Sequence, residues 1–307
     1  MTRRAADAWL DGMPPHIPAR AGTLPPVCLL PGDPGRVDLA AQVLADYRVL
    51  GSRREFKIAT GSFAGRGMAV CSTGIGGPST EIAIVELSRL GVSTFIRVGG
   101  MGATRASIPP GSLTVVTQVA RGGGAARFYA PDAAEIPADQ EVTDALREAA
   151  IRRGAPAHEI RVLSCDSYYL GEGRPVAGLE ELAASRAADI DAMGVAAMDM
   201  ECETVFAVAR ALRRRYGAIL TAHGNRVTDE WLEDYEPAQL LMLQVACAAG
   251  AALAVPTSPE ASSLSADAPA PAQAVLPPGD QSGALSSGEA ATGQRPGVQA
   301  EPAVRKP

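Results

Sequence analysis

The sequence predicts an α/β fold, a three-layer α/β/α sandwich around a mixed central sheet. Short apolar runs, which are typical of buried strands, alternate with longer stretches whose apolar residues recur at helical spacing. Two strand-like runs are joined by Ala64-Gly65-Arg66-Gly67, which indicates a β-hairpin and therefore an antiparallel pair within the sheet. Gly-rich loops follow three of the strands, at the sheet edge where α/β proteins bind ligands.

The expected elements follow from these patterns in chain order. Strands are expected at 27–30, 56–63, 68–72, 94–98, 113–117, 161–164, 197–200 and 218–222. Helices are expected at 37–45, 80–90, 142–152, 179–191, 201–215 and 237–254. The helix at 80–90 has Ile84 and Leu87 at helical spacing and ends at Gly91, a residue that often terminates helices.

The chain is expected to contain three parts: a flexible N-terminus at 1–13, one domain at 14–254, and a disordered tail at 255–307. The tail is rich in Ala, Pro, Ser and Gly and has no aromatic residue, so it cannot bury a core. The central part has a normal size for a single α/β domain.

Composition excludes several classes of function. A net charge of −6 gives no reason to expect a nucleic-acid partner. No apolar segment of signal-peptide length follows Arg3-Arg4, and no run approaches the ~20 apolar residues of a membrane span. The five cysteines are far apart, which favours buried free thiols over zinc ligands or disulfides. We therefore expect a cytoplasmic protein with no membrane partner.

The three Gly-rich loops favour an enzyme that binds phosphate. Their sequences are PGDPGR (31–36), STGIGGPST (72–80) and RVGGMG (97–102). Glycine lets backbone N–H groups approach an anion, and arginine adds a planar charged fork that suits phosphate. The first two loops lack G-x-G-x-x-G, and no G-x-x-x-x-G-K-[ST] is present, so neither a Rossmann site nor a P-loop is expected.

Two charged residues stand at positions where charge needs an explanation. Arg97 lies within a buried-looking strand, where an unpaired guanidinium costs free energy, so we expect an anionic partner, which could be a ligand. Replacing it with alanine is expected to abolish activity and leave the fold intact. Glu201, in MDMECE (198–203), follows a short strand and could accept hydrogen bonds from two sugar hydroxyls. Glu203 is expected only to complement the N-terminus of the next helix.

These motifs resemble the nucleoside phosphorylase family, closest to the hexameric uridine phosphorylases. The resemblance runs from about His16 to about Ala254, and CSTGIGGPST (71–80) is its longest and most distinctive segment. It is also dense at PGDPGR (31–36), REF (54–56), FIRVG (95–99), MDMECE (198–203) and NR (225–226). It implies a phosphorylase/hydrolase-like α/β fold and a pentosyltransferase of nucleoside catabolism and salvage.

The resemblance implies a role for each candidate site residue. Phosphate-binding residues are Gly32, Arg36, Arg97 and, from a neighbouring subunit, Arg54. Ribose-binding residues are Met200, Glu201 and the neighbour's His16. Base-binding residues are Tyr168, Glu172, Arg174 and His223, with Arg226 in the region that closes over the site. Arg36, Arg97 and Glu201 are the candidate catalytic residues.

The resemblance also implies the cofactors and partners. No metal or organic cofactor is required, and inorganic phosphate is the co-substrate of a nucleoside. Glu55, Ile75 and Ser79 match a monovalent-cation site between subunits, a candidate K⁺ site. A site shared between subunits implies a homodimer at least, and a hexamer is typical of the family.

Four positions depart from the family pattern. Gly100 replaces a Thr or Ser that contacts phosphate and ribose, which weakens phosphate binding by about 0.5–1.5 kcal/mol unless another donor substitutes. Glu172 replaces a glutamine that contacts both O2 and N3–H of uracil. A carboxylate would suit a base edge with two donors, as in guanine-like bases, or it pairs with Arg174 and contacts no base. His223 and Gly224 replace apolar residues, adding a titratable group and removing side-chain volume.

The expected reaction is phosphorolysis of a nucleoside N-glycosidic bond, with a uridine-type pyrimidine nucleoside as the first candidate substrate. The alternatives are a purine or modified-nucleoside phosphorylase, a phosphate-independent nucleosidase, and a non-catalytic nucleoside-binding paralogue. Retention of Arg36, Arg54 and Arg97 argues against the nucleosidase, whereas Gly100 favours it mildly. The sequence leaves open the base, the choice between ribose and deoxyribose, the oligomer number and the role of the tail.

Overall fold

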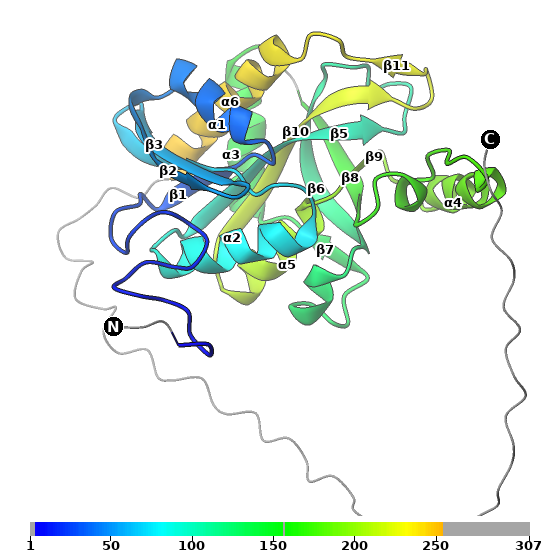
Figure 1. Cartoon of the computed structure of the whole chain (residues 1–307). Coiled ribbons are helices and arrows are strands. Elements are labelled where there is room, and N and C mark those ends of the chain that lie inside the picture. The colour runs from blue at the N-terminus through cyan, green and yellow to red at the C-terminus, as the bar shows by residue number, and fades with distance from the viewer. Residues whose placement is uncertain (1–3, 156, 254–307) are drawn as a thin grey trace, which may run out of the picture. The chain divides into compact units, whose positions relative to one another are not determined.

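The computed structural model describes residues 4–155 and 157–253, so the expected disordered tail at 255–307 lies outside the described residues. Figure 1 shows a mixed sheet with helices packed against it, as the sequence predicts. The strands are β1 (Val27–Leu30), β2 (Ala45–Arg53), β3 (Phe56–Phe63), β4 (Arg66–Cys71), β5 (Thr94–Ala103), β6 (Leu113–Gly122), β7 (Glu135–Pro137), β8 (His158–Cys165), β9 (Ala197–Asp199), β10 (Arg215–Asn225) and β11 (Glu230–Trp231). The helices are α1 (Pro34–Leu39), α2 (Gly77–Arg89), α3 (Gln140–Arg152), α4 (Glu180–Ala192), α5 (Cys202–Ala211) and α6 (Glu236–Leu253).

The sheet contains both parallel and antiparallel pairs. β1 lies between β4 and β5 and is parallel to both, and the expected hairpin joins β3 and β4 antiparallel. Pairings β5–β10, β10–β6, β6–β8, β8–β9 and β9–β5 close a ring of strands. This closure brings the ends of β5, β9 and β10, which are far apart in sequence, to one place.

Alternating side chains of the central strands enter two hydrophobic clusters. In β1, Cys28 and Leu30 join the cluster that includes residues of α2 and α5, whereas Val27 and Leu29 join the cluster that includes residues of α1, α3 and α6. Successive residues of a strand point to opposite faces, so helices cover both faces of the strand. Near-continuous apolar strands are the expected consequence of this double covering.

Helix α6 is the one helix of the described part that is long and apolar enough to cross a membrane. Its buried residues, among them Met242, Val245 and Leu253, pack in the same cluster as α1 and α3. Its apolar composition is therefore explained by its place in the core. All five cysteines lie within the described residues and are buried free thiols, as expected.

Two expected helices are shorter than predicted. The helix expected at 37–45 begins earlier, at Pro34, and ends at Leu39. Residues from Ala45 onward form β2, an exposed edge strand that the sequence analysis did not predict. The helix expected at 201–215 stops at Ala211, because the backbone of Arg213 has a positive φ of 56° and the buried strand β10 begins at Arg215. In both cases, apolar residues that follow the helix continue its periodic pattern in the sequence, so the predicted helix was too long at its C-terminal end.

Candidate active site

Two of the Gly-rich loops are bonded to each other at the ends of β1 and β4. The N–H groups of Thr73 and Gly74 donate to the carbonyls of Pro31 and Gly32, at 2.9 and 3.0 Å. A Cβ on Gly32 would lie 3.1 Å from the carbonyl oxygen of Gly74, which is tighter than most such contacts. Glycine at position 32 therefore allows the two loops to approach.

Arg36 lies within helix α1 rather than at the end of a loop, which corrects the sequence-based expectation. The Asp33 carboxylate accepts a hydrogen bond from the N–H of Gly35 at 2.8 Å, and Pro34 occupies the first turn, so the helix starts before Arg36. The Arg36 side chain is buried and donates to the carbonyl of Val98 at 3.0 Å. Its Nε is buried and has no hydrogen-bond partner among the described residues.

The charge of Arg36 is held at an energetic cost. Burial, and next the charge of Arg97, lower the pKa of Arg36 from its usual value of 12.5 to about 10. No carboxylate of the described residues forms a salt bridge with it. Such a cation favours an anionic ligand that would restore the lost solvation.

Arg97 on β5 has anionic partners within the protein. Its Nε donates to Oδ2 of Asp199 at 2.8 Å, and its Nη2 forms an ion pair with Oε2 of Glu201. All three side chains are almost completely buried. Two carboxylates at the end of β9 are therefore anionic partners of the kind that the sequence analysis expected for Arg97.

Asp199 is a residue whose role the sequence analysis missed. Besides Arg97, its carboxylate accepts hydrogen bonds from the hydroxyl of Ser164 and from the N–H groups of Glu201 and Cys202 at the start of α5. It therefore fixes both the arginine and the helix that presents Glu201. Its position at the end of a buried strand was the available signal.

Glu201 connects this network to the second Gly-rich loop. Its Oε1 accepts a hydrogen bond of 2.6 Å from the N–H of Gly76, directly before α2. Burial is the largest influence on its pKa, which is raised although Arg97 opposes the shift. Glu203 lies in the first turn of α5, as expected, and its Oε2 also accepts from the N–H groups of Gly122 and Gly123 around the end of β6.

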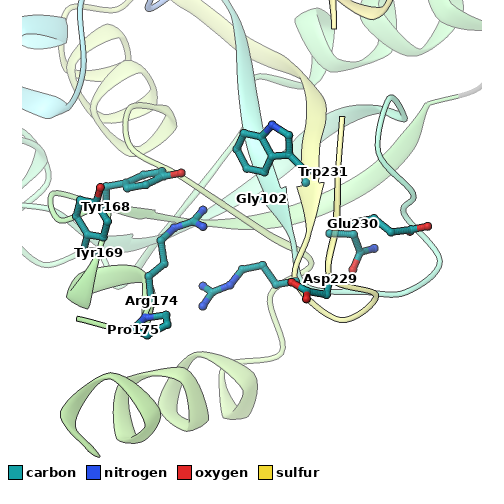
Figure 2. Close-up of a pocket in the computed structure, with 11 residues that line it drawn as sticks. Gly102, Tyr168, Tyr169, Arg174, Pro175, Asp229, Glu230 and Trp231 are labelled. Atoms are coloured by element: carbon teal, nitrogen blue, oxygen red, sulfur yellow. The ribbon is translucent and has the colours of Figure 1, made fainter. Parts of the chain in front are cut away.

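Met200 and Glu201 line a cavity of about 330 Å³ together with all four base-binding candidates. The other lining residues include Ile75, Gly100, Tyr168, Glu172, Arg174 and His223. A second cavity of about 580 Å³ shares Gly102, Tyr168, Arg174 and Trp231 with the first. Figure 2 shows Tyr168 and Arg174 on one side of this second cavity and Trp231 on the other.

Glu172, Arg174 and Tyr168 form a connected group at the cavity wall. Nε of Arg174 donates to Oε2 of Glu172 at 3.2 Å, and its guanidinium lies 4.1 Å from the centre of the Tyr168 ring. The Glu172 side chain is buried, and this burial raises its pKa although Arg174 lowers it. One carboxylate oxygen is thus held by Arg174, and Oε1 forms no hydrogen bond among the described residues.

Aromatic rings occupy the space next to Gly100 and Gly224, the two glycines that differ from the family pattern. A Cβ on Gly100 would lie 2.4 Å from Cε1 of His223, and a Cβ on Gly224 would lie 2.8 Å from Cε3 of Trp231. Gly224 removes side-chain volume, as expected, and the indole of Trp231 on β11 occupies that space. Trp231 was missed because the short strand β11 has no clear pattern in the sequence.

Of the remaining candidates, His16 and Arg54 line neither cavity, whereas Arg226 lines the second. His16 forms an ion pair with Glu86 (Nδ1 to Oε1, 2.7 Å), and Arg54 is exposed in the turn between β2 and β3. Arg226 donates to the backbone carbonyls of Glu172 and Gly173, which ties the chain just after β10 to the base-binding group.

The three candidate cation ligands lie around one loop. A Cβ on Gly74 would lie 2.8 Å from Cγ of Glu55 and 3.3 Å from Oγ of Ser79, and that hydroxyl faces the carbonyl of Ile75 at 3.4 Å. Across 4–155 and 157–253, no cluster of three or more His, Cys, Asp or Glu side chains could hold a metal ion.

Known proteins resemble the chain over the region that builds this site. Residues 26–253 match the phosphorylase superfamily. A uridine phosphorylase from Thermococcus kodakarensis is 38% identical over 225 residues, which covers 72% of this chain and 80% of that enzyme. A guanosine phosphorylase from Halorubrum lacusprofundi is 36% identical over 215 residues, covering 69% and 84%. The uridine phosphorylase of Escherichia coli is 36% identical over 211 residues, covering 66% and 82%. The chain therefore belongs to the phosphorylase superfamily.

Proposed function

We propose that the protein cleaves the N-glycosidic bond of a nucleoside by phosphorolysis, giving a pentose 1-phosphate and the free base. Its relatives make it an enzyme of the pentosyltransferase class. Arg36 supports phosphate as the second substrate: its guanidinium is buried near Arg97, and no described carboxylate neutralises it. A buried cation without a protein anion is a binding group for an anionic substrate.

The residues of the site can perform this reaction without a covalent intermediate. A phosphate oxygen bonds to C1′ of the sugar while the C–N bond breaks and its electron pair leaves on the base nitrogen, which takes a proton from phosphate or water. Because the sugar carbon gains positive charge, the phosphate held by Arg36 and Arg97 acts as both nucleophile and counter-charge. Glu201 orients the sugar through its hydroxyls, and Arg174 stabilises charge on the departing base. Positioning and electrostatics supply the catalysis.

The rest of the site requires a second copy of the chain. We assign Gly32 and the neighbour's Arg54 to phosphate, and Met200 and the neighbour's His16 to ribose. Exposure of Arg54 supports this assignment, because the side chain is available to another subunit. The same proposal includes a homo-oligomer, with a hexamer as the family's usual form, and a K⁺ bound by Glu55, Ile75 and Ser79. It also includes a cytoplasmic location and a three-layer domain at 14–254.

Two classes of base remain as candidates. A uridine-type pyrimidine nucleoside is the first, because several similar enzymes are uridine phosphorylases. The second is a 6-oxopurine nucleoside such as guanosine, and Glu172 favours it. The free Oε1 of this buried carboxylate can accept a hydrogen bond from a ring N–H, whereas an ionised carboxylate would repel O2 of uracil. One similar enzyme is a guanosine phosphorylase.

Base release is expected to require inorganic phosphate. We would incubate the full chain with a panel of pyrimidine, purine and modified nucleosides, with and without phosphate, and measure free base and pentose 1-phosphate. Equal amounts of both products, formed only with phosphate, are expected. Base release at the same rate without phosphate would show a nucleosidase, and binding by calorimetry without turnover of any nucleoside would show a non-catalytic protein.

The preference between the two classes of base is expected to depend on pH through Glu172. Burial raises its pKa, so the carboxyl becomes protonated at a higher pH than an exposed glutamate. The protonated group can donate to O2 of uracil and accept from N3–H, whereas the ionised group only accepts. The ratio of kcat/KM for uridine to that for guanosine should therefore rise about tenfold as pH falls through this titration.

Taking a ratio removes the effect of phosphate ionisation, because both reactions use phosphate. Glu172→Gln is the matched control, since its amide has one donor and one acceptor at every pH. This variant should favour uridine, and its ratio should be independent of pH. A ratio in the unmodified enzyme that stays constant, or a Glu172→Gln variant with the same pH dependence, would remove Glu172 from base recognition.

A further inference from the structure

His223 is the extra residue of a β-bulge beside the site. Ala222 of β10 pairs with Met101 of β5, and Gly224 pairs with Gly102, so His223 has no partner in the ladder. Bulges next to active sites commonly redirect a side chain. Here the imidazole crosses to the neighbouring strand and lies over Gly100, where a Cβ would be within 2.4–2.9 Å of Cε1, Nδ1 and Nε2. Glycine at position 100 is what leaves room for the ring.

The charges that shift the pKa of this imidazole are those of two arginines, and no carboxylate of the described residues forms an ion pair with it. Its ring stacks on that of Tyr235, with centroids 5.4 Å apart. Burial, and then the charges of Arg36 and Arg97, lower its pKa from 6.5 to about 4, so the ring is neutral at physiological pH. Its Nε2 is buried, and the structure gives this atom no hydrogen-bond partner within the described part of the chain.

Two polar groups in this region therefore lack hydrogen-bond partners among the residues that the structure describes, Nε2 of His223 and Nε of Arg36. A buried polar atom without a partner costs about 1–3 kcal/mol, and such atoms in native proteins need an explanation. The nearby charges favour an anion over a neutral base as the missing partner, because Arg36 and Arg97 both act on the ring. A small tetrahedral oxyanion can accept hydrogen bonds from several donors at once.

From this arrangement we infer that His223 is a ligand of the phosphate co-substrate and not a base-binding residue. The inference rests on the proposed function, since it assigns a further contact to that same phosphate. A neutral imidazole has one donor and one acceptor, as a hydroxyl group does. One ring nitrogen can thus donate to phosphate while the other accepts from a sugar hydroxyl. Gly100 and His223 together replace the contact that a Thr or Ser at position 100 would make.

Steady-state kinetics with phosphate and nucleoside varied separately test this inference. His223→Ala should raise the KM for phosphate about 10- to 100-fold, the range for a hydrogen bond to a charged group, and change the KM for nucleoside less than about threefold. His158→Ala is the matched control, because His158 is exposed at the start of β8. A raised nucleoside KM with an unchanged phosphate KM would return His223 to base recognition and overturn the inference.

A double variant separates the lost hydrogen bond from a disturbed fold. Gly100→Ser combined with His223→Ala places a hydroxyl in the space that the imidazole vacates and should recover at least half of the loss in phosphate affinity on a logarithmic scale. Gly100→Ser alone should be as impaired as His223→Ala, because its side chain and the ring would occupy the same space. Failure of the double variant to improve on His223→Ala would contradict the assignment.

Binding to the free enzyme gives a readout that does not need turnover. The chain has three histidines, so the ring ¹⁵N signals of the labelled enzyme are few and His223→Ala identifies one of them. Titration with inorganic phosphate should shift the His223 signal and leave that of His158 unchanged. If the unmodified enzyme shows no phosphate dependence and no shift, the proposed function fails. If it depends on phosphate but His223 does not respond, only this inference fails.

Discussion

Replacing Arg36 with methionine is expected to lower kcat/KM for phosphate about 10²- to 10³-fold and to leave thermal stability unchanged or slightly increased. The loss is of the size seen when one preorganised group that stabilises charge in a transition state is removed. Stability should not fall, because the buried Arg36 has no carboxylate partner in the described part of the chain and its lowered pKa shows that its charge is disfavoured. Methionine is an unbranched, flexible apolar side chain that can occupy the space of the arginine stem without its charge.

Two measurements check this prediction. Kinetics at varied phosphate give kcat/KM, and thermal unfolding of the same preparation gives Tm. Arg127→Met is the matched control, because Arg127 is an exposed arginine that forms no salt bridge in the described part of the chain. If Arg36→Met lowered Tm by as much as it impaired activity, Arg36 would be a structural residue and the assigned phosphate contact would lose its main support.

The sequence was sufficient to predict the components of the site that are local. Glycine and proline fix the loop after β1, and the strand character of residues 94–98 identified Arg97 as a buried charge in need of an anion. Those conclusions depend on residue types and short-range spacing, which can be read directly from the amino-acid sequence. The expected end of α5 failed because Arg213 breaks the helix through a positive φ, which its residue type does not indicate.

Contacts across the sheet could not be predicted in the same way. Asp199 pairs with Arg97 across 102 residues, and nothing in the spacing of MDMECE distinguishes it from Glu201 and Glu203. Gly100 and Gly224 each indicated only a lost side chain when considered alone. Gly100 and Gly224 instead leave room for His223 and Trp231, and the bulge that aims His223 is a property of strand pairing.

Removal of Arg97 is expected to affect the fold as well as the activity, contrary to the expectation from sequence. Arg97→Ala would leave Asp199 and Glu201 buried side by side without their cation. Breaking a buried ion pair by deleting one partner costs about 3–5 kcal/mol, which corresponds to a fall in Tm of roughly 6–20 °C for a domain of this size. Turnover should be abolished even in the fraction that remains folded, because Arg97 is one of the proposed phosphate ligands.

The pH dependence of stability distinguishes an unpaired carboxylate from a simple loss of packing. Glu201 already has a raised pKa because of burial, and loss of Arg97 would raise it further. A carboxyl whose pKa is higher in the folded than in the unfolded state destabilises the fold above that pKa, and the penalty disappears as pH falls below the unfolded value. The stability deficit of Arg97→Ala, measured by denaturant unfolding, should therefore shrink at acidic pH. Adding Asp199→Asn should recover part of the deficit at neutral pH, since one buried charge is removed. A deficit that is the same at every pH, and unaffected by Asp199→Asn, would mean that Arg97 stabilises the fold by packing alone.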